Sequence, residues 1–273
     1  MFLDTVKNNE IETNKLVKTF AQATDEEITY LLGLHKEGII DLTEYWSVGD
    51  ERTIHLNAMS AMSPFSDVYP EQNVLLKILH GPNAFDLSDD EGGGKNIFVI
   101  GIIPLLGFDT IINGRPQLET SSGNSGGWKN CTRRPWFDNI FREALPTEVK
   151  KWFKKFKYLS YDGYGTTTSS IIENYFTLPS VSEVFGPSYN TNYVPSSEDS
   201  VQFDLYKNNV NKYYKFNKID DSQWSMSTYG WWLRSSANYI YNNIYYYCYC
   251  TRLLRLDRNT PISTFGFAPF GVV

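Results

Sequence analysis

One stretch near the C-terminus, residues 238–250, constrains the fold of this chain more than any other. It reads Asn-Tyr-Ile-Tyr-Asn-Asn-Ile-Tyr-Tyr-Tyr-Cys-Tyr-Cys. Successive side chains of a strand point to opposite faces, so the odd positions predict one face of tyrosines around Asn243. The even positions predict a packed face of Ile240, Ile244, Cys248 and Cys250. Two interpretations stay open: an ordinary Tyr-rich antiparallel strand, or a binding face, since tyrosine combines large contact area with few torsions and a hydroxyl.

The flanking segments favour the binding face. Trp231 to Ser236 precede the stretch, and the chain ends with Gly266-Phe267-Ala268-Pro269-Phe270-Gly271, so large aromatic residues frame it on both sides. From Leu233 onwards the sequence contains no Lys, Glu, Gln, Trp or Met, although Lys and Glu are common earlier. A strand with one ordinary solvent-exposed face would include some of these residues. The pattern indicates a fixed frame around a segment of restricted composition.

The composition excludes several classes of protein. With 273 residues, 41% of them hydrophobic, the chain is long enough to bury a substantial core. A formal net charge of -6 argues against nucleic-acid binding. The longest apolar run, residues 97–106, is too short to span a membrane, so we expect no membrane insertion. Acidic residues near the start do not match a signal peptide, and three cysteines give no disulfide framework; we expect synthesis in a bacterial cytoplasm.

Residues 1–41 differ from the rest and predict a short helical appendage that serves attachment or oligomerisation. Thr24 followed by Asp25, Glu26 and Glu27 is a typical helix start. Apolar residues then recur at helical spacing until Gly38, a natural stop. His35 on that side is interpreted as a packed or half-exposed histidine.

From residue 42 the pattern is rich in strands, with helices in the middle of the chain. Strands are predicted at residues 53–56, 74–79 and 97–103, and helices at 137–143 and 148–156, with a Ser/Thr-rich turn at 166–170. The acidic segment around Asp89, Asp90 and Glu91 is interpreted as a solvated loop; calcium binding is the alternative, although its spacing fails the helix-loop-helix pattern. Arg133 and Arg134 predict either an anion site or, more commonly, a surface or buried-network role.

The order of several motifs resembles the DUF6273 family of bacterial and phage proteins. The resemblance covers roughly residues 42–273, and Ser236 departs from it because the family more often has proline there. The matching motifs are Tyr45-Trp46-Ser47-Val48-Gly49-Asp50, Gly126-Gly127-Trp128, Leu145-Pro146, Leu178-Pro179 with Glu183-Val184-Phe185-Gly186, Trp231-Trp232-Leu233-Arg234-Ser235, and Gly266-Phe267-Ala268-Pro269-Phe270. The resemblance implies an α+β, C-type-lectin-like fold related to formylglycine-generating enzymes, with the ligand-binding domain at residues 42–273.

The same resemblance extends to the variable proteins of diversity-generating retroelements. In such systems adenines of a template are randomised, which yields a residue set without Lys, Glu, Gln, Trp or Met. Residues 237–260 obey that exclusion and are the expected variable segment. The expected ligand-binding residues are Tyr239, Tyr241, Asn243, Tyr245, Tyr247, Tyr249, Arg252, Arg255, Asp257, Arg258 and Asn259.

The function expected from these observations is non-enzymatic recognition of a cell-surface protein or glycan, at a phage tail or otherwise on a surface. The chain would act as a homo-oligomer, for example a trimer, or within a tail assembly. We predict no catalytic residue, no metal and no cofactor, because His35, His55 and His80 are scattered and no catalytic arrangement stands out. Two alternatives stay open: a structural tail component with no variable binding role, and an oxidoreductase that uses Cys248 and Cys250.

Overall fold

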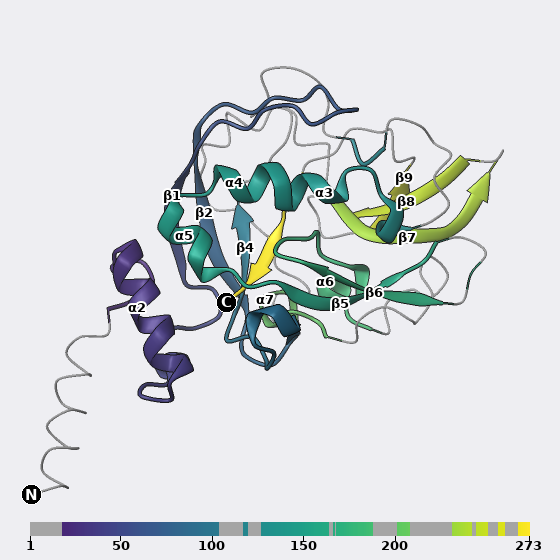
Figure 1. Cartoon of the computed structure of the whole chain (residues 1–273). Helices are drawn as coiled ribbons and strands as arrows, with labels where there is room; N and C mark the ends of the chain where they lie inside the picture. The colour runs from purple at the N-terminus through teal and green to yellow at the C-terminus, as the bar shows by residue number, and fades with distance from the viewer. Residues whose placement is uncertain are drawn as a thin grey trace, which may run out of the picture.

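A computed structural model shows helices packed with antiparallel sheets, which confirms the α+β class (Figure 1). The structure describes residues 18–103, 117–119, 127–163, 166, 168–187, 201–207, 231–241, 244–250, 256–259 and 267–273. Within these ranges no helix has the length and apolar character needed to cross a lipid bilayer.

The first sheet joins the beginning and the end of the chain. Its strand order is β1 (Glu51–Leu56), β2 (Gln72–His80), β4 (Val99–Ile103) and β10 (Phe270–Val272), with every neighbouring pair antiparallel. The three strands predicted at 53–56, 74–79 and 97–103 are therefore confirmed. Because β10 pairs with β4, the C-terminal Phe-Ala-Pro-Phe motif is drawn into the centre of the molecule.

The second sheet consists of β3 (Asp86–Leu87), β5 (Phe156–Tyr161) and β6 (Ser169–Asn174). It corrects two predictions, since the helix predicted at 148–156 ends at Trp152 as α5 (Thr147–Trp152), and β6 begins inside the predicted turn. Phe156, Tyr158 and Ser160 are buried, whereas Lys157 and Leu159 between them are more exposed; Tyr161 at the end of the strand is buried as well. This alternation has the period of a strand, and it overrides the helical pattern of the preceding residues.

The helices begin and end where local chemistry favours it. In α2 (Asp25–Lys36), Thr24 accepts a hydrogen bond from the Glu27 amide and Glu27 accepts one from the Thr24 amide, a capping box that confirms the predicted start. The predicted helix at 137–143 is continuous with flanking turns. It comprises α3 (Arg134–Trp136), the π-helical η5 (Phe137–Phe141) and α4 (Arg142–Ala144).

The remaining elements include short helices and the strands of a third sheet. They are the 3-10 turns η1 (Leu42–Glu44), η2 (Asp89–Glu91) and η4 (Trp128–Asn130), the helices α6 (Val181–Phe185) and α7 (Asp204–Lys207), and the strands β7 (Trp231–Tyr241), β8 (Ile244–Cys250) and β9 (Leu256–Asn259).

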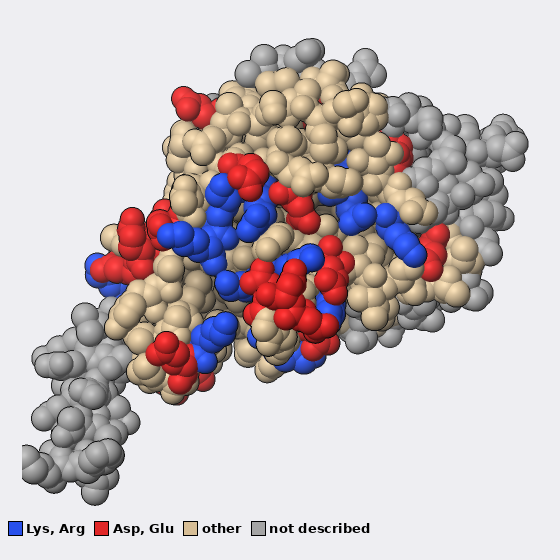
Figure 2. Space-filling model, viewed as in Figure 1, with Lys and Arg blue, Asp and Glu red and all other residues tan. Residues whose placement is uncertain are grey.

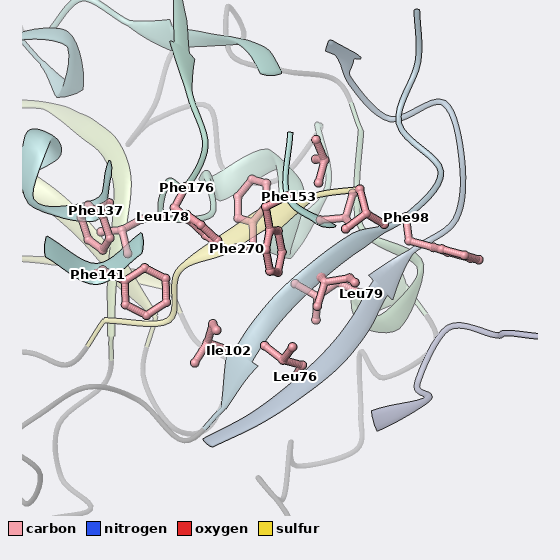
Figure 3. Packing of buried hydrophobic residues seen from close by; sticks show 14 of the residues in the cluster. Leu76, Leu79, Phe98, Ile102, Phe137, Phe141, Phe153, Phe176, Leu178 and Phe270 are labelled. Atoms are coloured by element: carbon pink, nitrogen blue, oxygen red, sulfur yellow. The ribbon is translucent and has the colours of Figure 1, made fainter. Parts of the chain in front are cut away.

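Aromatic side chains from distant parts of the chain fill the core (Figure 3). The ring of Phe176 lies 4.6 Å from that of Phe153 and 5.0 Å from that of Phe141, measured between centroids. Strand β10 packs against the rings of Phe153 and Phe176. A Cβ added at Gly271 would lie 2.6 Å from Phe153 and 2.9 Å from Phe176, so the close approach of the strand requires glycine.

The N-terminal helix packs against the same core. Ile28 and Leu31 of α2 are buried in the main hydrophobic cluster, together with Phe20. Arg52 of β1 donates a 2.6 Å hydrogen bond to Asp25. The division of the chain at residues 41 and 42 stays a prediction. In Figure 1, α2 lies at one end of the molecule and β7, β8 and β9 lie at the other.

Candidate binding surface

The predicted binding residues fall on a separate three-stranded sheet with the order β7-β8-β9. Both neighbouring pairs are antiparallel. Tyrosine, isoleucine and tryptophan dominate β7 and β8, and these residues favour strands because they pack well on a pleated surface. The sheet is the region of the molecule in which the Tyr-rich sequence is organised.

The single strand predicted for residues 238–250 is wrong, because the stretch is a hairpin. β7 ends at Tyr241, β8 begins at Ile244, and these two residues pair with each other. Asn242 and Asn243 stand between the strands in sequence, and asparagine is among the residues preferred in hairpin turns. Tyr241 pairs with Ile244 and Ile240 pairs with Tyr245, so each odd-numbered residue of β7 stands opposite an even-numbered residue of β8. The odd-numbered residues of the two strands therefore do not form one uninterrupted face.

The register nevertheless brings separate predicted residues together. Tyr247 of β8 pairs with Asn259 of β9, and Tyr249 pairs with Asp257. Cys248 pairs with Arg258, whose side chain is half-buried. Directly opposed residues of an antiparallel pair are near neighbours, about 5 Å apart. Tyr247 and Tyr249 therefore belong with Asn259 and Asp257 to one contiguous patch of backbone.

The other predicted residues are distributed as follows. Tyr239 and Tyr241 lie on β7 and Tyr245 lies on β8, whereas Asn243, Arg252 and Arg255 lie outside the described residues. Ala237, the first residue of the expected variable segment, is buried with 1% of its surface exposed. This residue belongs to the core rather than to a displayed surface.

A buried ion pair, which sequence reasoning missed, holds the base of β7. The two terminal guanidinium nitrogens of Arg234, Nη1 and Nη2, donate 2.6 Å hydrogen bonds to the two carboxylate oxygens of Glu183, and both side chains are fully buried. Arg234 also donates to the carbonyl oxygen of Leu178 at 2.8 Å, and Glu183 accepts from the Ser180 amide at 2.7 Å. The bidentate geometry satisfies charges that would otherwise be costly to bury.

Backbone contacts strengthen the same junction. The Arg234 amide donates to the carbonyl oxygen of Pro179 at 3.0 Å, and the Val181 amide donates to the Ser235 hydroxyl at 2.9 Å. Two motifs that the sequence showed separately, Leu178-Pro179 and Trp231-Trp232-Leu233-Arg234-Ser235, are thus one structural unit. A signal was present in the sequence: a Ser180-x-x-Glu183 capping box stands in an apolar segment, as the α6 cap confirms.

A buried polar network around Tyr158 lies next to the Arg234 side of the ion pair. The guanidinium carbon of Arg234 is 4.7 Å from the centre of the Tyr158 ring. The Tyr158 hydroxyl accepts a hydrogen bond from the Trp128 indole at 2.9 Å and donates to Asn174 at 2.9 Å. Burial raises the pKa of Tyr158 from 10.0 to about 12, and burial also raises the pKa of Asp138, to which Asn174 donates at 2.6 Å. The network joins η4, β5 and β6 next to the start of β7.

Arg133 forms a second buried ion pair, which confirms the buried-network interpretation of this residue. Its guanidinium donates to both carboxylate oxygens of Asp67, at 2.7 and 2.9 Å. It also donates to the carbonyl oxygen of Gln117 and lies 3.6 Å from the centre of the Phe65 ring. Arg134 donates to Asn174. With these contacts, Arg133 joins three separate chain segments, and its guanidinium is occupied by protein groups instead of forming an anion site.

The acidic segment of η2 is held by lysines. Asp89 and Asp90 pair with Lys157 at 2.7 Å and Lys155 at 3.2 Å, and Glu91 pairs with Lys154 at 3.7 Å. The three histidines lie in different places, where His35 accepts from the Leu42 amide, His55 contacts Asn73 and His80 pairs with Asp204. In the part of the chain that the structure describes, no three His, Cys, Asp or Glu side chains converge as metal ligands would.

Comparison with known proteins supports one assignment. Residues 105–252 match a family model described as "Domain of unknown function (DUF6273)", a range narrower than the motifs at 42–273 but longer than half of the chain. A search of curated proteins and a search of solved structures each return no match. The matched range includes the Gly127-Trp128 motif, both partners of the Glu183–Arg234 ion pair, and strands β7 and β8. The chain belongs to the DUF6273 family.

Proposed function

We propose that this protein is a non-enzymatic binding protein whose β7-β8-β9 sheet recognises a ligand through its tyrosines. The observation that carries the proposal is the register, which sets Tyr247 and Tyr249 beside Asn259 and Asp257. Tyrosine supplies contact area at a low entropic cost, and neighbouring Asn and Asp supply hydrogen-bonding groups. Such a mixture is typical of binding surfaces.

The scaffold that we propose is C-type-lectin-like, and the displayed segment is that of a retroelement variable protein. Two observations support this. The sequence from Leu233 onwards lacks Lys, Glu, Gln, Trp and Met, and the buried Glu183–Arg234 pair fixes β7 at its base. A surface can tolerate changes in sequence when its stability depends on residues outside it. The ion pair, the Tyr158 network and the buried Ala237 all lie at or near the part of β7 that precedes the Tyr-rich hairpin.

The place of action that we propose is a phage tail or another exposed surface, with a cell-surface protein or glycan as ligand. Several copies on one particle would raise weak single-site binding by avidity. A structural tail component with an unvarying C-terminal segment is the alternative. Sequencing of the gene across many isolates separates the two: substitutions confined to about residues 238–260, at adenines of a nearby near-copy, support the variable binder, and an unvarying segment contradicts it.

The binding role has a direct test on the full chain. Fluorescently labelled protein is titrated onto a panel of bacterial cells, and strains that bind it are selected. The combined substitutions Tyr245→Ala, Tyr247→Ala and Tyr249→Ala are expected to weaken binding at least about tenfold, since aromatic residues dominate binding energies. Tyr30→Ala is the matched control, because Tyr30 is 65% exposed on α2 at the other end of the molecule. Equal binding by the triple variant and the control contradicts the proposal.

A further inference from the structure

A second candidate site lies at the end of the molecule opposite the β7-β8-β9 sheet. It is a groove with a cavity volume of about 530 Å³, between α2 on one side and the loop around η2 with the end of α5 on the other. Natural ligand clefts have volumes of about 300–1,000 Å³. Figure 2 shows this hollow beside the charged residues that gather around the loop.

The groove combines an apolar floor with a basic rim. The partly buried side chains of Leu32, Leu87 and Ile97 form its apolar floor. The rim carries four lysines and, among the described lining residues, a single acidic side chain, that of Glu91; the lysines are Lys36, Lys95, Lys151 and Lys154. The whole chain has a net charge of -6, so this concentration of positive charge is local. Its chemistry matches an anionic ligand that also has an apolar part.

The ion pairs of these lysines are easily exchanged. Lys95 pairs with Asp86 at 2.8 Å and both side chains are about half exposed, and Lys154 is 3.7 Å from Glu91. Lys151 pairs with Glu148 while 53% of the lysine side chain is exposed. Ion pairs in contact with water contribute little to stability. An incoming carboxylate can therefore replace the present partners at a small cost.

We propose that the groove binds an acidic peptide segment of a partner protein. An aliphatic side chain of that segment packs on the floor of Leu32, Leu87 and Ile97, and flanking carboxylates pair with the lysine rim. Because α2 and the β7-β8-β9 sheet lie at opposite ends of the molecule, a partner in the groove leaves the sheet uncovered. The site is suited to attach the protein to a larger assembly, and the proposal does not depend on the ligand of the sheet.

Titration of the ¹⁵N-labelled full chain with a synthetic peptide tests the proposal. The probe is acetyl-Glu-Leu-Glu-amide, and acetyl-Gln-Leu-Gln-amide is the neutral control. We expect the acidic peptide to shift the NMR signals of the Trp152 indole and of the Gly93 and Gly94 amides, which line the groove. We expect the glutamine peptide to bind about tenfold more weakly, since it lacks the charges that pair with the rim.

Two variants locate the site. Lys36→Glu combined with Lys151→Glu is expected to weaken binding of the acidic peptide at least about tenfold by turning attraction into repulsion. Lys129→Glu with Lys207→Glu is the matched control of equal charge change at exposed lysines that do not line the groove, and it is expected to shift the affinity less than about twofold. Circular dichroism spectra verify that both variants are folded.

Several outcomes overturn the proposal. They are equal affinity for the two peptides, signal shifts that map outside the groove, no shift at millimolar peptide, and equal effects of the two double variants. Self-association also overturns it: if sedimentation shows oligomers that Lys36→Glu with Lys151→Glu dissolves, the occupant is a second copy of this chain. Binding of host cells through the tyrosines is measured separately, so failure of either proposal leaves the other intact.

Discussion

Glu183 and Arg234 are 51 residues apart in sequence, yet their side chains meet in a doubly hydrogen-bonded ion pair with no exposed surface. The pair ties α6 to the start of β7, the strand that leads into the Tyr-rich hairpin. A buried charge is tolerated because its partner is present, and loss of one partner leaves the other charge uncompensated. The pair is therefore a sensitive point for the stability of the whole surface.

Arg234→Met is expected to lower the free energy of unfolding by about 3–5 kcal/mol, because it leaves the Glu183 carboxylate buried and unpaired. Urea denaturation measures the loss. Lys157→Met is the control, since it removes an exposed pair with Asp89 and is expected to cost less than about 1 kcal/mol. The double variant Glu183→Leu with Arg234→Met is expected to recover much of the loss. A cost for Arg234→Met as small as that of the control would show that the pair does not anchor β7.

Gly127→Ala tests the backbone that positions Trp128. Gly127 has a φ of +61°, and an added Cβ would lie 2.3 Å from the carbonyl oxygen of Tyr161. Gly38 has a similar φ of +71° but open space around it. Gly38→Ala is expected to cost about 1–2 kcal/mol from the backbone conformation alone, and Gly127→Ala is expected to cost clearly more. Equal losses in thermal or urea unfolding would mean that the contact with Tyr161 relaxes without cost.

Local chemistry accounts for the parts of the fold that the sequence predicts well. The capping box of Thr24 and Glu27 lies within four consecutive residues, and the apolar run at 97–103 contains the whole of β4. Each can therefore be recognised from its own local sequence. Failures occur where the period is ambiguous. Residues 148–156 are predicted as a helix, but α5 ends at Trp152 and β5 begins at Phe156, where Tyr158 and Ser160 continue a strand alternation.

The sequence proposes residues for the candidate surface but does not predict their arrangement. The Tyr-rich composition points to residues 238–250, whereas the pairing of Tyr241 with Ile244 divides the stretch into two strands, which a continuous Tyr and Ile alternation conceals. The pairing of Tyr247 with Asn259 is set by strand register, and no local pattern encodes it. The match of Glu183 to Arg234 is equally non-local, because each residue alone reads as an ordinary charge in an apolar motif.

Tyr158 predicts a loss of stability at alkaline pH. Its pKa rises from 10.0 to about 12 on folding because the neutral hydroxyl is buried. As the pH rises from about 10 to 12, the unfolded chain therefore releases this proton before the folded chain does, and the free energy of unfolding falls by about 3 kcal/mol over that interval. Urea unfolding between pH 9 and 12 is compared for the natural chain and Tyr158→Phe. Between pH 10 and 12 the free energy of unfolding of Tyr158→Phe is expected to fall less steeply, by the slope that one titrating proton contributes. Parallel curves for the two proteins would show that the Tyr158 hydroxyl does not cause the loss.

The fixed end of β7 sets a limit on the variable segment. Ala237 is 1% exposed, so Ala237→Tyr forces a large ring into a packed position and is expected to cost about 1–3 kcal/mol in urea unfolding. Arg258→Tyr, at a half-buried position of β9, is the control and is expected to change the free energy of unfolding by less than about 1 kcal/mol. Diversification of the segment is then expected to spare position 237 and to begin beyond it. If Ala237→Tyr folds with unchanged stability, the packing at this position does not restrict the segment, and the boundary at residue 237 stands as the sequence predicts it.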